Sequence, residues 1–143
     1  MHIYIINGPN LNLLGTREVD IYGIQSFDSF LQELQGRFPE VVFSYFQSNV
    51  EGELINKLHE AARMADGVVL NAAAFTHTSL ALGDAVAAIA IPVVEVHISN
   101  IYARETFRKN SFTAPHSAGV ITGFGLEGYA LAVTYLKNKN HPG

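Results

Sequence analysis

The chain has 143 residues, 48% of them hydrophobic and 15% charged, and this length predicts one domain over residues 1–143 with its own hydrophobic core. It has no cysteine, which excludes disulfides, thiolate zinc sites and cysteine nucleophiles. Because no apolar run reaches the roughly 18 residues of a membrane span, the N-terminus has no signal-peptide features and the net charge is −4, we expect a cytoplasmic protein that binds neither membranes nor nucleic acid.

Short apolar segments alternate with segments of helical periodicity along the chain. Strands are predicted at 2–6, 41–47, 67–71, 91–96 and 119–122, and helices at 27–38, 51–65, 78–90 and from about 126 to 136. Ser26 is the expected N-cap of the first helix. The strand at 67–71 is almost wholly apolar, as in sheets whose two faces are both covered. The alternation predicts an α/β fold, a flavodoxin-like three-layer sandwich with a five-stranded parallel sheet of order 2-1-3-4-5.

A loop of nearly twenty residues follows the first strand, and loops of this length in a compact domain are usually functional. In parallel sheets of this kind, ligands bind outside the carboxyl ends of the strands. The polar residues at these ends and in the loops that follow are Asn7, Asn10, Arg17, Tyr22, Asn71, Thr76, His77, His97, Ser99, Arg104 and Arg108. We therefore expect a site built from amides, imidazoles, a phenol and arginines.

Several of these residues also have a purely structural interpretation. An asparagine at a strand end often caps a turn through its own side chain, which we favour for Asn7, whereas Asn10 and Asn71 stay open between capping and function. His77 has two interpretations as well, as a ligand-binding group or as a structural partner of Asp84 on the following helix. The polar loop after His97 favours a functional role for that residue.

The sequence contains segments that look like cofactor or metal motifs, but the residues around them do not fit such sites. The segment 123–128 matches G-x-G-x-x-G, but only 15 residues follow it, too few for a dinucleotide-binding unit, so its glycines are expected to form a tight turn and allow close helix packing. Glu95 and His97 share a strand face without a third metal ligand, and the first loop lacks the composition of a flavin phosphate loop. No lysine ends a buried strand, so a Schiff base, which needs a desolvated lysine, is not expected.

The remaining residue types suit proton transfer on a small, polyhydroxylated anion. Arginines and backbone amides can hold a carboxylate, and a histidine can give a proton to a leaving group. Tyrosine, with an ordinary pKa of about 10, is a poor base at neutral pH unless a cation within about 4–6 Å favours its anion. Arg17 lies in the same loop as Tyr22 and is the expected cation.

These residues occur within a set of longer motifs that resembles the type II 3-dehydroquinate dehydratases. The resemblance extends over nearly the whole chain and is carried by the segments NGPNLNLLGTRE at 7–18, IYG at 21–23, QSNVEGELI at 47–55, LNAAAFTHTS at 70–79, IPVVEVHISNIYARETFR at 91–108 and GFGLEGY at 123–129. It implies reversible dehydration of 3-dehydroquinate to 3-dehydroshikimate, a step of the shikimate pathway, by anti elimination through an enolate. It also implies that no metal or organic cofactor takes part.

The resemblance also implies catalytic roles for individual residues. Tyr22 would remove a proton from C2, and Arg17 would keep Tyr22 anionic. Asn10 would help to stabilise the enolate through an ordered water. His97, oriented by Glu95, would be the general acid at the C1 hydroxyl.

By the same resemblance, further residues would bind substrate or join subunits. Asn71 and the backbone of Ile98 and Ser99 would hold the carboxylate, and His77 and Arg108 would bind ring hydroxyls. Asp84 would reach the site of a neighbouring subunit in a homo-oligomer, a dodecamer built from trimers. The charged fraction of 15% is low beside about 25% in average soluble domains, which agrees with a surface that other subunits cover.

Two segments depart from the family pattern. Ala73 stands where many relatives have a glycine, so the loop is expected to differ slightly if that glycine has a positive φ. At 114–117, the small and hydroxyl residues of the family are permuted. Two other classes of function stay open from the residues alone: a non-catalytic module that binds an anionic metabolite in the same crevice, and a structural or regulatory oligomer whose strand-end residues only cap turns.

Overall fold

A computed structural model describes residues 1–16 and 18–140 of the chain, and strands alternate with helices throughout these residues. The strands are β1 (His2–Asn7), β2 (Val42–Gln47), β3 (Gly67–Asn71), β4 (Val93–His97) and β5 (Gly119–Thr122). The helices are α1 (Val19–Tyr22), α2 (Phe27–Arg37), α3 (Glu51–Met64), α4 (Leu80–Ala88) and α5 (Glu127–Asn140). None of the helices described is long and apolar enough to cross a bilayer.

The five strands form one parallel sheet of order β2-β1-β3-β4-β5. This is the flavodoxin-like order predicted from the sequence. The register pairs Asn7 with Asn71 and His97 with Thr122. Because all strands run in the same direction, these polar residues meet at the carboxyl edge of the sheet.

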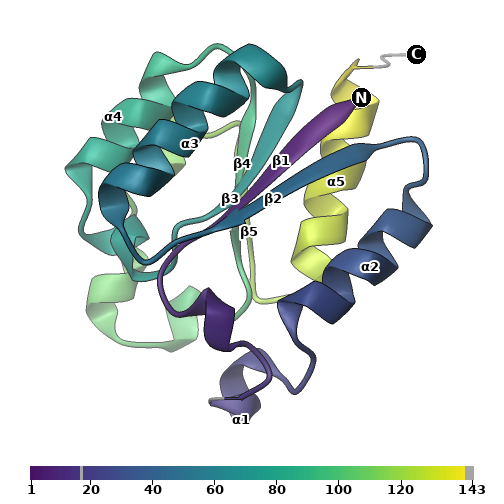
Figure 1. The fold of residues 1–143 in the computed structure, drawn as a ribbon. Coiled ribbons are helices and arrows are strands. Elements are labelled where there is room, and N and C mark those ends of the chain that lie inside the picture. The colour runs from purple at the N-terminus through teal and green to yellow at the C-terminus, as the bar shows by residue number, and fades with distance from the viewer. Residues whose placement is uncertain (17, 141–143) are drawn as a thin grey trace.

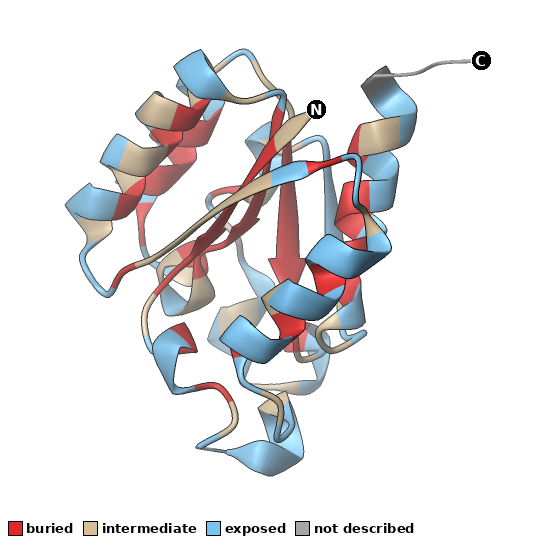
Figure 2. Ribbon diagram, turned by 45° about the vertical axis from the view of Figure 1, so that its right-hand side comes forward, coloured by how far each residue is buried: buried red, intermediate tan, exposed pale blue. Residues whose placement is uncertain are grey.

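Helices cover both faces of the sheet and make three layers, with α2 and α5 on one face and α3 and α4 on the other (Figure 1). Every residue of β3 and β4 is buried, which explains their apolar sequences and appears as the red centre of Figure 2. The sheet core therefore holds the ends of β3 and β4 firmly at the edge where the site is expected.

Helices α2 and α3 agree with the predicted ones to within one residue, whereas α1 lies in a segment predicted as a loop and α5 continues to Asn140 rather than to about 136. Ser26 caps α2 by accepting a hydrogen bond from the backbone N–H of Ser29 at 3.2 Å, as predicted. The helix predicted at 78–90 begins only at Leu80, because Ser79 is its N-cap and accepts from the backbone of Leu82 at 2.9 Å. A short 3₁₀ helix, Ala73–His77, precedes it.

The glycine-rich segment before α5 has the structural role expected of it. Gly125 has a φ of 62°, a left-handed conformation that favours glycine in a tight turn. A Cβ on Gly128 would lie 3.3 Å from a methyl group of Val96, so α5 approaches the sheet closely at this residue.

Candidate active site

A cavity of about 190 Å³ opens at the carboxyl edge of the sheet. Of the ten predicted site residues, eight line it: Asn10, Tyr22, Asn71, His77, His97, Ile98, Ser99 and Arg108. Arg17 lies outside the described residues. Asp84 is exposed on α4 and does not line the cavity of its own chain. The structure therefore brings together residues from three segments, those that follow β1, β3 and β4, at the position that the strand-end rule predicts.

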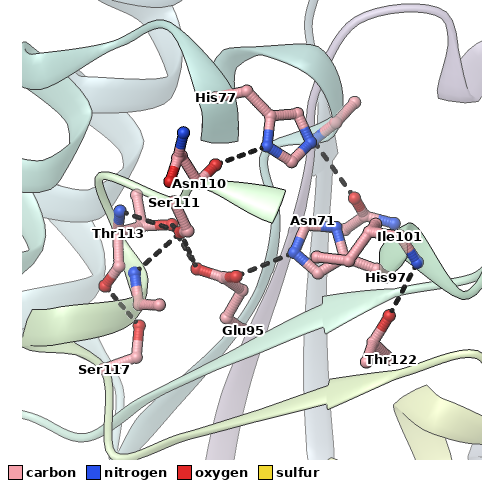
Figure 3. A network of polar contacts seen from close by, with 12 residues as sticks. Asn71, His77, Glu95, His97, Ile101, Asn110, Ser111, Thr113, Ser117 and Thr122 are labelled. Carbon is pink, nitrogen blue, oxygen red and sulfur yellow. Dashed lines mark hydrogen bonds and ion pairs between the residues drawn. The ribbon is translucent and has the colours of Figure 1, made fainter. Parts of the chain in front are cut away.

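His97 and Glu95 form a buried pair at the end of β4 (Figure 3). The side chains are 5% and 1% exposed, and His97 Nε2 lies 2.8 Å from Glu95 Oε2. Burial alone would raise the pKa of the Glu95 carboxyl, but hydrogen bonds from His97, Thr113 and Ser111 outweigh it and hold that pKa below its usual range. Glu95 is therefore an anion that accepts from Nε2, and Nδ1 is the ring nitrogen left for a ligand.

His77 lies beside this pair, with its ring stacked on that of His97 at a centroid distance of 6.0 Å. Its Nδ1 lies 2.7 Å from the backbone carbonyl of Asn110, so the structural partner is this carbonyl and not Asp84. Burial lowers the pKa of His77, the Asn110 carbonyl opposes this in part, and the charges of His97 and Arg108 lower it further. A neutral ring that donates from Nδ1 has Nε2 free to accept from a hydroxyl.

Tyr22, the last residue of α1, also lines the cavity. Arg104 Nη1 donates to the phenol oxygen at 2.9 Å and also lies 3.3 Å from Ser99 Oγ. The sequence identified Arg104 only as one of several loop arginines and assigned the cation beside Tyr22 to Arg17. Its position in the loop after β4 was the one signal that could have found it.

Two backbone groups and one side chain offer further hydrogen bonds at the cavity. Among the described residues, the backbone N–H groups of Ile98 and Ser99 have no acceptor. Arg108 lines the cavity while its Nε donates to Glu105 Oε2 at 2.5 Å. Free N–H donors beside a guanidinium form a place for a carboxylate or for hydroxyl groups.

Asn71 is held by a chain of buried hydrogen bonds. Its Nδ2 donates to Tyr129 Oη at 2.9 Å, and its Oδ1 accepts from the backbone of Ala73 at 3.1 Å. Tyr129 Oη in turn donates to Asn7 Oδ1 at 2.7 Å, and Asn7 Nδ2 lies 3.4 Å from Tyr45 Oη. The prediction that Asn7 caps its own turn is therefore wrong, because its side chain bonds across the core.

Among residues 1–16 and 18–140, three with side chains have a positive φ, and all three line the cavity: Asn10 at 69°, Glu18 at 43° and Ala73 at 52°. A left-handed conformation costs about 1–2 kcal/mol for a residue with a Cβ. Ala73 thus adopts the backbone conformation that a glycine would take without strain. The chain accepts this local strain beside the site, and a difference between this loop and that of relatives with a glycine stays a prediction.

The arrangement supports transfer of two protons on one bound molecule. A phenol beside a guanidinium is one group that can transfer a proton, and an imidazole backed by a buried carboxylate is the other. Within residues 1–16 and 18–140, no group of three or more His, Asp or Glu side chains lies together in a way that could hold a metal ion.

Comparisons with known proteins show the family of the chain. The family model described as dehydroquinase class II matches residues 1–137. A 3-dehydroquinate dehydratase of Bacillus licheniformis is 54% identical over 143 residues, covering 98% of both chains. One from an Exiguobacterium species is 58% identical over 134 residues, covering 93% of this chain and 92% of the other. The crystal structure of type II dehydroquinase from Butyrivibrio crossotus superposes with a TM-score of 0.93 at 42% identity, covering 96% and 97% of the two chains.

Proposed function

This chain belongs to the class II dehydroquinase family and is a 3-dehydroquinate dehydratase, and we propose that Tyr22 is the base and His97 the general acid of its reaction. One observation carries the proposal. Tyr22, Arg104 and His97 line the same cavity, and Glu95 lies behind His97, so a molecule inside the cavity meets the proposed base and the proposed acid. The elimination removes a proton from C2 and the hydroxyl from C1, which needs both.

The first step takes the C2 proton onto the Tyr22 oxygen. Arg104 donates a hydrogen bond to this oxygen, and its positive charge favours the phenolate over the phenol. As the C–H bond breaks, its electron pair moves into the adjacent ketone and forms an enolate. Asn10 lines the cavity and would help to hold an ordered water against the enolate oxygen. Arg17 is proposed to close over the substrate and to add a second positive charge.

The second step expels the C1 hydroxyl as water. The enolate electrons return to form the C1–C2 double bond, while His97 gives the leaving oxygen a proton from Nδ1. Glu95 accepts from Nε2, so its negative charge stabilises the imidazolium that carries this proton. The acid is regenerated by the proton that Tyr22 has taken, through solvent.

Binding groups hold the substrate between base and acid. The free N–H groups of Ile98 and Ser99 and the amide of Asn71 are proposed to hold the carboxylate. The neutral ring of His77 accepts from a ring hydroxyl through Nε2, and Arg108 donates to another. These contacts fix the ring, so that the C2 proton faces Tyr22 and the C1 hydroxyl faces His97.

The test is a direct assay of the purified chain with 3-dehydroquinate as the sole addition. We expect the ultraviolet absorbance of the conjugated enone in 3-dehydroshikimate to rise, with the same rate in EDTA or after borohydride treatment in the presence of substrate. Inactivation by borohydride would indicate an imine on a lysine and contradict the phenolate mechanism. Thermal stabilisation by substrate without any absorbance change would make the chain a binding module.

The assembly and location stay predictions. We propose a homo-oligomer, a dodecamer of trimers in the cytoplasm, in which exposed Asp84 reaches the site of a neighbouring chain. Light scattering on the purified protein measures the subunit number. A monomer with full activity would exclude a contribution of Asp84 to any other chain's site.

A further inference from the structure

The carboxylate behind His97 is held by two hydroxyl groups from the loop before β5, and the proposed function does not use them. Ser111 Oγ lies 2.9 Å from Glu95 Oε1, and Thr113 Oγ1 bonds to the same oxygen. Thr113 is 0% and Glu95 1% exposed, so these bonds form away from water. Figure 3 shows the two hydroxyls on one side of the carboxylate and His97 on the other.

The hydrogen-bond partners of Ser111 fix the direction of these bonds. Its Oγ accepts from the backbone N–H groups of Thr113 at 3.2 Å and Ala114 at 2.9 Å. Both lone pairs of the hydroxyl are thereby occupied, so Thr113 Oγ1, which lies 3.2 Å away, does not donate to it and gives its own proton to Glu95 Oε1. The single proton of Ser111 points toward Glu95 Oε1 at 2.9 Å, the nearer of its two acceptors. Glu95 Oε1 thus accepts from the surrounding hydroxyls, and the group is held as a carboxylate rather than as an acid.

This direction determines the protonation of His97. An anionic Glu95 has only acceptors, so Nε2 must be the donor in the 2.8 Å contact. The neutral ring is then the tautomer with hydrogen on Nε2, and Nδ1 is the nitrogen that gains and loses a proton at the cavity. If the carboxyl carried the proton instead, Nε2 would accept it and the pair could not present a charged acid to the substrate.

We propose that Ser111 and Thr113 are positioning residues that commit one oxygen of Glu95, so that the other oxygen fixes the tautomer and orientation of His97. The inference rests on the proposed role of His97 as general acid and extends it to the hydroxyls that make this role possible. The inference also assigns a function to Ser111 and Thr113, which directly precede residues 114–117. Those four residues are the ones that depart from the family pattern. Neither hydroxyl touches the substrate in this scheme.

Thr113 offers a matched pair of variants. Thr113→Val keeps the shape and removes the hydroxyl, whereas Thr113→Ser keeps the hydroxyl and removes a methyl group. We expect kcat to fall about tenfold or more in the valine variant, with KM within twofold of wild type, because partners behind a functional histidine typically contribute 10–100-fold. The serine variant should keep kcat near the wild-type value.

A third variant controls for the loop itself. Ser117 Oγ donates to the Thr113 backbone carbonyl at 2.9 Å and makes no contact with Glu95, so Ser117→Ala disturbs the same turn without touching the carboxylate. We expect its kcat to stay near that of wild type. A fall of kcat in Thr113→Ser or in Ser117→Ala equal to that in Thr113→Val would show that packing of the turn matters rather than the hydroxyl, and would overturn the proposal.

A second measurement is independent of turnover. The ¹⁵N resonances of the His97 ring, assigned by their loss in His97→Gln, report which nitrogen carries the proton. We expect the Nε2–H tautomer in the wild-type protein and a mixed population in Thr113→Val. A wild-type tautomer in Thr113→Val together with unchanged kcat would overturn the proposal. If the wild-type chain fails to dehydrate 3-dehydroquinate, the proposed function falls, while the tautomer measurement still decides the role of the hydroxyls.

Discussion

The two sides of the cavity are built in different ways. The acid side consists of Asn71, Glu95 and His97, each at most 5% exposed and each hydrogen-bonded within the sheet core. The base side is α1, a helix of four residues with no buried member. Left-handed residues flank it, Glu18 with a φ of 43° and Gly23 with a φ of 85°. The core thus pre-organises the residue proposed as the acid, whereas a surface segment presents the residue proposed as the base.

Because the two sides differ in burial, substitutions on them should have different effects on stability and on rate. Substitutions on the acid side disturb buried polar groups, so they should change both stability and rate. Substitutions on the base side touch few core contacts, so they should change the rate while the free energy of unfolding stays the same. Each prediction below strengthens this contrast or removes it.

The largest effect is expected for Tyr22→Phe. Loss of the phenol oxygen removes the base, and general bases contribute roughly 10²–10⁴-fold to a rate. We expect kcat to fall by about 10³-fold in the enone assay, with an unchanged urea midpoint. Turnover within tenfold of wild type would remove Tyr22 as the base, and a lowered urea midpoint would show that α1 contributes to stability after all.

Glu95→Gln should lower kcat by about 10²-fold, because the imidazolium loses its buried counter-charge. It should also change how stability depends on pH. The pKa of Glu95 lies below its ordinary value of 4.5, so the carboxylate contributes stability that is complete above pH 4.5 and is lost as the pH falls below it. The difference in unfolding free energy between wild type and variant should therefore shrink between about pH 4.5 and pH 3. A constant difference over that interval would contradict the assignment of an ionised Glu95.

Tyr129→Phe tests the buried chain behind Asn71. It leaves Asn7 Oδ1 and Asn71 Nδ2 without their hydroxyl partner in the core, which costs about 1–3 kcal/mol. We expect that loss in urea unfolding together with a raised KM. Tyr45→Phe is the control, since it removes the 3.4 Å bond to Asn7 and leaves Asn71 untouched. Equal KM values for Tyr129→Phe and Tyr45→Phe would show that the orientation of Asn71 does not affect substrate binding.

Arg104→Gln removes the charge beside the Tyr22 oxygen. The Tyr22 oxygen then loses a charged hydrogen-bond donor, and such bonds are roughly twice as strong as neutral ones. We expect about a tenfold loss of kcat, with unchanged stability. The parallel variant Arg17→Gln decides which arginine matters more. A loss of kcat in the Arg17 variant alone would return the role to the residue that the sequence indicated.

The smallest effect is expected for Ala73→Gly. Glycine relieves the left-handed strain at a φ of 52°, so the free energy of unfolding should rise by about 0.5–1 kcal/mol. Ala74→Gly is the matched control, because Ala74 has no positive φ and a glycine there adds only backbone entropy to the unfolded state. Destabilisation by both variants to the same degree would show that Ala73 is not strained.

The sequence predicts the parts of the structure that repeat a pattern. The apolar segments give the five strands, their alternation with helices gives the sheet order, and the strand-end rule locates the cavity. The contact between Arg104 and Tyr22 joins residues 82 positions apart in two irregular loops, and no spacing rule relates such segments. The hydrogen bonds from Ser111 and Thr113 to Glu95 also cannot be predicted from the sequence. Serine and threonine are common in loops, and only the fold shows which carboxylate their hydroxyls contact.

The bond between Tyr129 and Asn7 has a consequence for the biosynthesis of the protein. It joins residues 122 positions apart, the end of the first strand and the last helix. A chain still on the ribosome can pair β1 with β3, but it cannot orient Asn71 until α5 has emerged and docked. Completion of the site is therefore coupled to completion of the polypeptide, because the hydroxyl that binds the Asn71 amide in the core belongs to the last helix.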